Sequence, residues 1–187
     1  TRVDSSAAVF VGRVREREAM ARAFGSACQG RGRLLAVAGE AGIGKTSLVD
    51  TFLADQARTV RFSVAPGRCS ERVAGTEAYL PWLEALEAMR RHGRAALIKR
   101  LAPAWHAQLA PLDDEHASDV LIAASLRSAS QERLKRELAA LLEAAASEQP
   151  LVVVIEDLHW ADVSTIDLLA FVGSRLATMA VLVVTTY

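Results

Sequence analysis

The chain has 187 residues, 51% hydrophobic and 24% charged, which is the composition of a globular domain and not of a disordered segment. Its 22 basic and 22 acidic side chains cancel, so the charge balance argues against nucleic acid and against an anionic membrane as partners of this segment. No apolar run approaches the roughly 20 residues of a membrane span, and no basic and apolar leader opens the sequence, so we expect a cytoplasmic location.

The first third of the chain predicts helices and strands in alternation. Residues 15–28 have a helical pattern of apolar side chains. We expect a buried strand at residues 33–38, because residues 34–38 form an apolar run. Residues 47–53 again have helical spacing, and residues 59–64 alternate as a second strand does. We expect Pro66-Gly67 to end this second strand.

The middle of the chain, residues 66–149, is predicted to be a helical insertion. Pro81 suits the first turn of one helix, prolines at 103 and 111 mark an irregular connector, and Ser130 opens a long helix. Core packing is the favoured interpretation of the large apolar side chains of this region, with a ligand groove as the alternative: Trp82, Trp105, Leu134, Leu138, Leu141 and Leu142.

Two further strands are predicted after the insertion. Residues 151–155 are continuously apolar, which is typical of a strand that is buried on both faces in a parallel sheet. Ser164 and Asp167 resemble a capping pair at the start of a helix, and residues 181–186 form the last strand. Strands that alternate with helices in this way predict a parallel, three-layer α/β fold.

A glycine-rich stretch between the first strand and the second helix fits the phosphate-loop pattern G-x-x-x-x-G-K-[ST]. Its glycines let backbone N–H groups converge on a phosphate at a helix N-terminus. We expect Lys45 to reach the β- and γ-phosphates and the Thr46 hydroxyl to bind Mg²⁺. A plain glycine-rich turn with a surface lysine is the alternative, but the strand and helix around it favour a nucleoside-triphosphate site. The expected ligands are Gly39, Glu40, Ala41, Gly42, Ile43, Gly44, Lys45, Thr46 and Ser47.

Two adjacent carboxylates, Glu156 and Asp157, close the third strand. Such a pair is costly at the end of an apolar strand unless it meets a positive group, and at this edge of a parallel sheet it would face the nucleotide. We expect Glu156 to orient Mg²⁺ or its water ligand. Asp157 is expected to polarise the attacking water and to act in catalysis together with Glu156 and Lys45. The expected metal ligands are Thr46, Glu156 and Asp157. His159 either contacts a phosphate or the catalytic water, or is a structural loop residue.

ATP is favoured over GTP as the nucleotide, because the guanine-reading pattern N-K-x-D needs an asparagine and this sequence contains none.

Five segments together carry a resemblance to a known family. In chain order they are residues 9–13 (VFVGR), the loop at 39–46, residues 79–86 (YLPWLEAL), residues 157–162 (DLHWAD) and the closing Thr-Thr-Tyr. In this respect the chain resembles the AAA-type ATPase module of signal-transducing (STAND) ATPases, as found in large LuxR-type bacterial transcriptional regulators. Similar modules are joined to adenylate cyclases and to serine/threonine kinases. The likeness spans nearly the whole chain, and the DLHWAD run is its most specific part.

The resemblance implies roles for further residues. Val11, Gly12 and Arg13 would lie near the adenine, and Thr185 or Thr186 would be the sensor at the end of the fourth strand. The family usually has aspartate where this chain has Glu156. Its sensor arginine would follow Tyr187.

The same resemblance implies a strand order of 5-1-4-3-2. We therefore expect residues 1–8 to be a linker and residues 9–187 to be a C-terminally truncated P-loop ATPase domain without its fifth strand and lid. The uniformly apolar first strand would become an exposed edge. In that case we expect this fragment to bind nucleotide weakly or not at all and to associate through that strand.

The predicted function is that of a Mg-ATP-binding, slowly hydrolysing switch in a multidomain signalling protein, foremost a LuxR-type regulator. The expected partners are ATP and ADP, the other domains of its own full-length chain, and further copies of itself in a homo-oligomer. One alternative is a module that holds nucleotide without turnover. Others are a phosphotransferase, or the ATPase module of an adenylate cyclase or Ser/Thr kinase.

Overall fold

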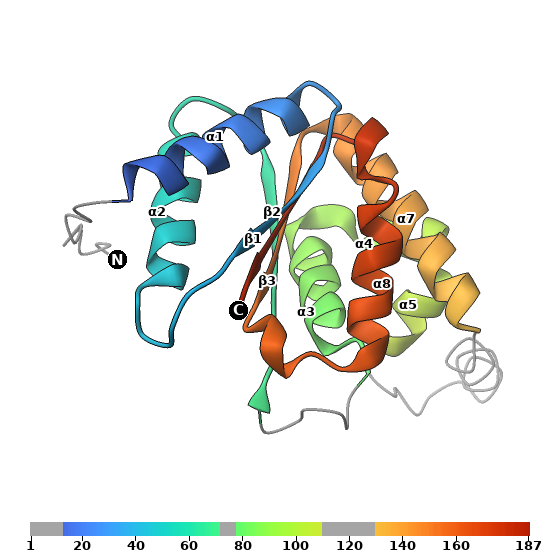
Figure 1. Cartoon of the computed structure of the whole chain (residues 1–187). Coiled ribbons are helices and arrows are strands. Elements are labelled where there is room, and N and C mark those ends of the chain that lie inside the picture. The colour runs from blue at the N-terminus through green and yellow to red at the C-terminus, as the bar shows by residue number, and fades with distance from the viewer. Residues whose placement is uncertain (1–12, 72–77, 110–129) are drawn as a thin grey trace, which may run out of the picture.

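The computed structural model describes residues 13–71, 78–109 and 130–187. A parallel sheet of four strands lies at its centre, with helices on both faces (Figure 1). The strands follow the order β1-β4-β3-β2. Their bounds are β1 Arg33–Val37, β2 Ser63–Arg68, β3 Leu151–Glu156 and β4 Val181–Thr186. The predicted parallel α/β fold, with a helical region between the second and third strands, is confirmed.

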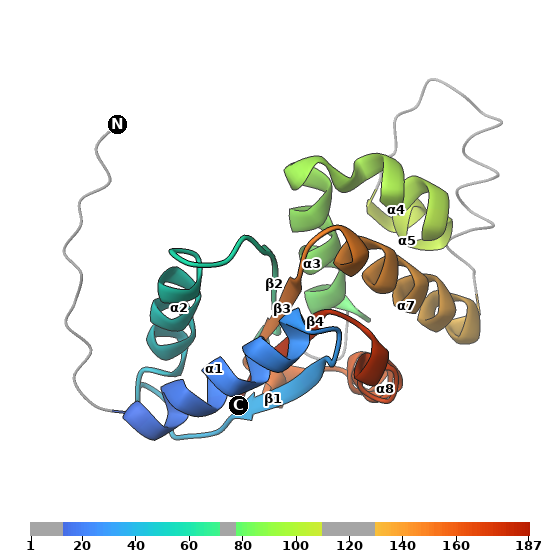
Figure 2. The same cartoon turned by 90° about the horizontal axis from the view of Figure 1, so that it is seen from above.

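The helices divide into two groups, one on each side of the sheet (Figure 2). On one side lie α1 (Val14–Cys28) and α2 (Lys45–Gln56). On the other side lie α3 (Leu80–Met89), α4 (Ala95–Leu101), α5 (Pro103–Leu109), α7 (Gln131–Glu148) and α8 (Val163–Gly173). Short helical turns are at Arg90–Arg94, Leu158–Trp160 and Leu176–Thr178. Within the described ranges, no helix is both long enough and apolar enough to cross a membrane.

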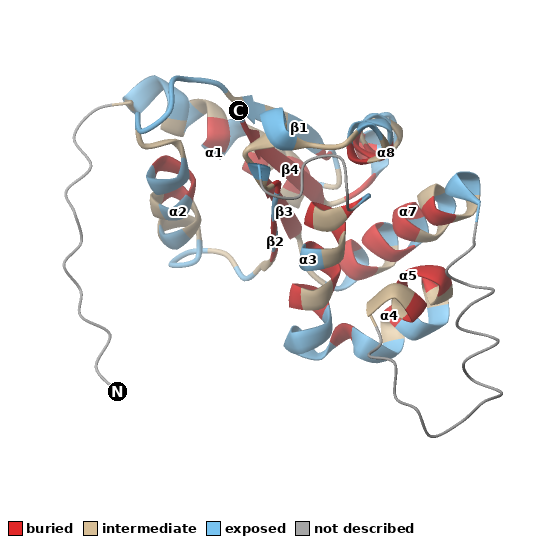
Figure 3. Ribbon diagram, turned by 90° about the horizontal axis from the view of Figure 1, so that it is seen from below, coloured by how far each residue is buried: buried red, intermediate tan, exposed pale blue. Residues whose placement is uncertain are grey.

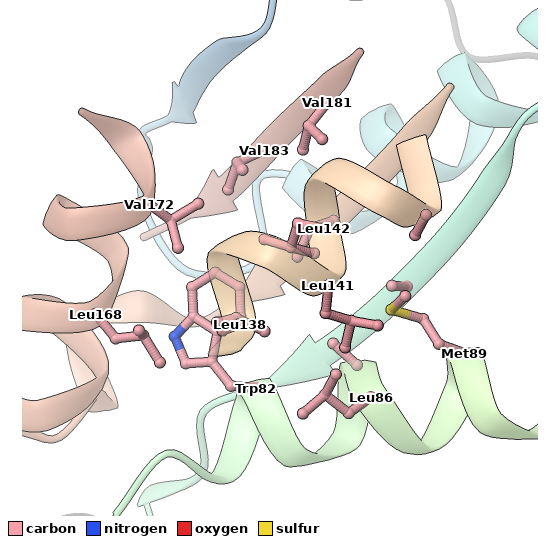
Figure 4. Close-up of a cluster of buried hydrophobic side chains, with 14 of the residues drawn as sticks. Trp82, Leu86, Met89, Leu138, Leu141, Leu142, Leu168, Val172, Val181 and Val183 are labelled. Atoms are coloured by element: carbon pink, nitrogen blue, oxygen red, sulfur yellow. The ribbon is translucent and has the colours of Figure 1, made fainter. Parts of the chain in front are cut away.

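The larger hydrophobic core lies between the sheet and α3, α7 and α8. Figure 4 shows side chains of α3 facing the leucines of α7: Trp82, Leu86 and Met89 opposite Leu138, Leu141 and Leu142. The indole N–H of Trp82 donates to the carbonyl of Thr165 at 3.4 Å, and that of Trp105 donates to the carbonyl of Leu134 at 2.9 Å. Both indoles are buried with their polar atoms paired, so the core interpretation of the two tryptophans is confirmed.

A smaller core lies under α1 and α2. Phe24 of α1 makes edge-on contacts with Phe52 of α2 and with Phe62, at centroid distances of 6.1 and 5.0 Å. β1 lies at the edge of the described sheet, where it pairs with β4, and its Leu34, on the face toward α8, is 46% exposed. Figure 3 shows β1 pale at the sheet edge, whereas β3 and β4 are red. The expected exposure of the first strand is therefore present in the described structure.

The second strand was predicted four residues too early, at residues 59–64. The structure places it at Ser63–Arg68, with Pro66 and Gly67 inside it. Because β2 lies at the edge of the sheet in the described part of the chain and pairs there with β3, a proline can sit in it without breaking a ladder on its free side. Gly67 is required at its position, since a Cβ there would lie 1.8 Å from the carbonyl oxygen of Pro81.

Two predicted boundaries in the second half of the chain were also wrong. Pro103 does not mark a connector but opens α5, where its missing N–H would be unpaired in any case. The cap of α8 is Asp162, whose carboxylate accepts from the backbone N–H of Thr165 at 3.0 Å, and not Ser164. Asp167 instead forms an ion pair with Lys135 at 2.7 Å.

Candidate functional site

The glycine-rich loop joins the end of β1 to the start of α2, as its sequence predicts. Gly44 has a φ of 86° directly before the helix, a conformation that glycine adopts without steric cost. The ammonium group of Lys45 lies over the loop and donates to the carbonyl oxygens of Gly39 at 2.7 Å and Glu40 at 3.1 Å. The lysine is therefore already held at the mouth of the loop, beside the N-terminus of α2.

A cavity of about 550 Å³, here called the loop cavity, opens beside this loop. One wall is the loop itself and the other comes from the ends of β2 and β3 and the segments that follow the acidic pair. Its lining residues are Gly39, Ala41, Gly42, Gly44, Lys45, Thr46, Arg68, Asp157, His159, Trp160 and Tyr187. The cavity thus brings together the lysine, the threonine and one of the two predicted acids.

The two acids that close β3 lie on different cavities. Asp157 lines the loop cavity, and its N–H donates to the hydroxyl of Thr186 at 3.0 Å. Asp157 also has a φ of 54°, an uncommon backbone conformation that this hydrogen bond helps to hold. Glu156 lines a neighbouring cavity of about 490 Å³ together with Glu84.

Arg68, the last residue of β2, contacts Asp157 directly. Its Nε and Nη2 atoms each lie 2.9 Å from Oδ2 of Asp157. The hydrogen bond and charge of Asp157 raise the pKa of the Arg68 guanidinium. The sequence analysis missed Arg68 because it ended the second strand too early. The available signal was an arginine that closes a strand at the same sheet edge as the acidic pair.

A second cavity, of about 400 Å³, lies at the N-terminus of α1 and is here called the α1 cavity. Its wall combines α1 with the free side of β1: Arg13, Glu16, Ala19, Met20, Leu35, Ala36, Val37, Ala38 and Ile43. Nη2 of Arg13 donates to the carbonyl oxygen of Ile43 at 2.7 Å, so this arginine is tied to the glycine-rich loop. Val11 and Gly12, predicted beside Arg13, lie outside the described residues.

Aromatic side chains form part of the wall of the loop cavity. The rings of His159 and Trp160 are 5.1 Å apart, and Trp160 is 38% exposed. The sequence left His159 open between a site residue and a loop residue, and the structure places it on the cavity wall. Of the other predicted ligands, Glu40, Ser47 and Thr185 line neither of the two cavities.

The side chains of the loop cavity can hold a divalent cation only if water and the substrate supply the remaining ligands. Thr46 and Asp157 offer one hydroxyl and one carboxylate. In the described part of the chain no three His, Cys, Asp or Glu side chains come together as a metal cluster. Mg²⁺ suits such a site, because it keeps several waters and is usually held by one or two carboxylates plus phosphate oxygens.

Comparison with protein families gives a match over nearly all of the described fold. Residues 9–184 match the AAA ATPase domain. The matched range runs from before α1 into β4 and contains the glycine-rich loop, Arg68 and both acids. A comparison with curated proteins gives no match.

Proposed function

This chain belongs to the AAA ATPase domain family, and from that premise we propose that it binds Mg-ATP and hydrolyses it slowly. The observation that carries the proposal is the loop cavity. It sets Lys45 and Thr46 on one wall and Asp157 on the other, although these residues lie more than a hundred positions apart in the sequence. A cation at the phosphates and a carboxylate facing it are the two groups that phosphoryl transfer to water needs.

Lys45, Thr46 and Asp157 take distinct roles in this proposal. Lys45 exchanges the loop carbonyls for the β- and γ-phosphate oxygens. Thr46 and Asp157 hold Mg²⁺, which neutralises charge on the phosphates when it is bound. Glu156, on the neighbouring cavity, acts on the metal through a water ligand.

Asp157 also serves as the base for hydrolysis. The water oxygen forms a bond to the γ-phosphorus while the bond to the β–γ bridging oxygen breaks. ADP leaves with that electron pair, and the water proton passes to the Asp157 carboxylate. The Thr186 hydroxyl accepts from the N–H of Asp157 and so keeps the backbone of Asp157 in place during this step. This hydrogen bond is the contact that supports a sensor role for Thr186.

The α1 cavity is the proposed site of the adenine ring. It adjoins the loop through Ile43, and all of its lining residues except Arg13 and Glu16 are apolar, which suits a base-binding pocket. Arg13 fixes the loop from this side, and Val11 and Gly12 precede it in the chain. Adenine is preferred over guanine because the sequence has no asparagine to form the guanine-reading pattern.

The larger context follows from the resemblance of residues 157–162 and 79–86 to signal-transducing ATPases. On that ground we assign the domain to a cytoplasmic multidomain signalling protein. A LuxR-type regulator is the setting that we favour. The DNA contacts would then come from other domains of the full-length chain, and nucleotide turnover would switch its contacts with them or with further copies of itself. An adenylate cyclase or a Ser/Thr kinase is the alternative setting for the same module.

Release of phosphate from ATP by the full-length protein tests the proposed function. We expect slow release of phosphate and ADP that requires Mg²⁺ and stops when the metal is chelated. Retention of bound ATP without phosphate release would favour a binding module. Transfer of labelled phosphate to an added acceptor would instead indicate a phosphotransferase.

A further inference from the structure

A large cavity lies at the amino-terminal end of β2, at the opposite end of that strand from Arg68, and is here called the Arg94 cavity. Its volume is about 740 Å³, larger than that of the loop cavity. The start of β2, the end of α7 and the turn between α3 and α4 form its walls. It shares no lining residue with the loop cavity or the α1 cavity, so the proposed nucleotide site does not account for it.

Arg94 is buried in a run of residues that are otherwise exposed. Residues 90–93 and 95–96 are all exposed, whereas the side chain of Arg94 is 9% exposed. The helical turn of residues 90–94 leaves helical geometry at His92 and Gly93, and Gly93 has a φ of 87°, which glycine adopts without steric cost. Arg94 follows this break directly. Because arginine is almost never fully buried unless it is paired, the partners of Arg94 decide what the cavity can bind.

The guanidinium of Arg94 is bonded to neutral acceptors. Nη1 donates to the carbonyl oxygen of Ala145 at 2.8 Å, and Nη2 donates to the hydroxyl of Ser63 at 3.1 Å. Among the described residues the nearest carboxylate is that of Glu148, which is 65% exposed and lies 3.8 Å from Nη1, beyond hydrogen-bond distance. These contacts tie α7 to β2 but leave the positive charge without a bonded counter-ion. A buried cation in this state favours the binding of an anion.

The rest of the wall indicates what kind of anion fits. Phe62 and Val64 line the Arg94 cavity and also an adjoining cavity of about 540 Å³, whose walls are mostly apolar. Arg94 is the one arginine or lysine among the described residues that line the Arg94 cavity. A single guanidinium matches one carboxylate, which its planar fork binds through two parallel hydrogen bonds. A phosphate dianion carries more charge than this one cation balances, and the nearby Glu148 would repel it further.

We propose that the Arg94 cavity is a second ligand site of this domain, and that it takes a small organic monocarboxylate with an apolar body. The carboxylate binds the guanidinium of Arg94 beside Ser63, and the apolar part lies along Phe62 and Val64. A volume of this size is typical of small-molecule pockets. β2 runs from this site to Arg68 on the loop cavity, so one strand connects the two sites, and both can be occupied at once.

Ligand-observed NMR titration of the full-length protein with 3-phenylpropionate and 3-phenylpropanol tests this site. The two probes share an apolar body and differ in charge. We expect the parent to bind the carboxylate about tenfold or more tightly than the alcohol, because hydrogen bonds to charged groups are the strong ones. Arg94→Gln should remove this preference. Arg100→Gln is the matched control, since Arg100 is exposed on α4 and does not line the cavity, and it should keep the preference.

Gln149→Glu tests the charge of the site while Arg94 stays in place. Gln149 lines the cavity, and its amide donates to the same Ser63 hydroxyl as Arg94 does. The substitution is nearly isosteric and puts a carboxylate beside the guanidinium, so binding of 3-phenylpropionate should fall about tenfold and binding of 3-phenylpropanol should stay within about twofold. This variant decides the question if urea denaturation shows that Arg94→Gln does not fold. Gln131→Glu, at the exposed other end of α7, is its control and should bind both probes as the parent does.

The results separate this inference from the proposed function. Loss of the carboxylate preference in folded Arg94→Gln, or in Gln149→Glu where Arg94→Gln does not fold, supports the site. A parent that binds both probes equally, or neither, overturns it, and so does a preference that the deciding variant keeps. Loss of the preference in Lys45→Ala would place the probe in the loop cavity and would also overturn the inference. None of these outcomes changes the case for ATP binding, which is tested by phosphate release.

Discussion

The two faces of the sheet differ in how deeply they are packed. On the side of α3, α7 and α8, two tryptophans and a leucine stripe form a continuous buried core with the odd-numbered residues of β3. On the side of α1 and α2 the core is smaller, and β1 contributes to it through the partly buried Leu35 and Val37. The glycine-rich loop joins the elements of this second, more lightly packed side.

This difference suggests that folding stability and nucleotide binding depend on separate parts of the molecule. The large core supplies most of the buried apolar surface and holds the ends of β2 and β3 from one side. The loop and Lys45 lie at the surface between the end of β1 and the start of α2. They contribute no side chain to the buried core, so its packing does not depend on them. Substitutions on one side should therefore change the free energy of unfolding, and those at the loop should change binding or turnover.

The largest effect is expected for Trp82→Ala. Trp82 is 1% exposed and its indole N–H is paired, so truncation leaves a large cavity in the main core. We expect the free energy of unfolding to fall by about 3–5 kcal/mol, measured by urea denaturation. Trp160→Ala is the control, because Trp160 is 38% exposed, and it should change this free energy much less. Equal losses in the two variants would contradict the division into a stabilising side and a binding side.

Asp157→Asn should separate turnover from binding. The amide keeps the shape of the side chain but cannot accept a proton from water, so phosphate release should fall by about a hundredfold or more. Calorimetry should show ATP affinity close to that of the parent. Glu156→Asp is the companion variant and should be tolerated, since it restores the residue that is usual in the resembling family. Parental turnover in Asp157→Asn would place the catalytic base elsewhere.

Lys45→Ala should weaken nucleotide binding without a matching loss of stability. A charge-assisted contact to phosphate is worth roughly 1.5–3 kcal/mol, so ATP affinity should fall about tenfold or more in calorimetric titration. In the structure Lys45 bonds only to carbonyls of its own loop, so urea denaturation should give nearly the parental midpoint. If folded Lys45→Ala bound ATP with the parental affinity, the assignment of residues 39–46 as a phosphate loop would be wrong.

The smallest overall effect is expected for Leu34→Lys, which changes neither the main core nor the loop cavity. A charged side chain protects a sheet edge from pairing with another chain, so this change should lower self-association of the chain as measured by light scattering. Because Leu34 is half exposed, the free energy of unfolding should change by only about 0.5 kcal/mol. A parent chain that is already a monodisperse monomer would show that the β1 edge does not drive association.

The sequence predicted those features that depend on neighbouring residues. The loop at 39–46 is a local pattern whose backbone and helix start carry the chemistry, and it lies where it was expected. The apolar runs of β3 and β4 are long and continuous, and both strands were placed to within one residue. Their order in the sheet followed from the resemblance and is confirmed.

Features that depend on distant partners were not predictable from one sequence. Pro66 and Gly67 look like the end of a strand until β2 is known to be an edge and Pro81 is known to lie against it. The pairing of Arg68 with Asp157 joins two strands that the helical region separates. Asp162 caps α8 and also accepts from the N–H of Tyr79 at 3.2 Å, a second contact that made it a better cap than Ser164.

The pairing of β1 with β4 alone has a consequence for the order in which the protein can form. Among the described strands, β1 is the first to leave the ribosome and β4 is the fourth, so β1 has no partner among them until the other three have been synthesised. Pairings between segments so distant in the chain are slow to form, because the intervening loop must close first. The glycine-rich loop directly follows β1, so it should be the last part of the site to become able to bind nucleotide. A growing chain should gain nucleotide binding only after β4 has emerged and docked.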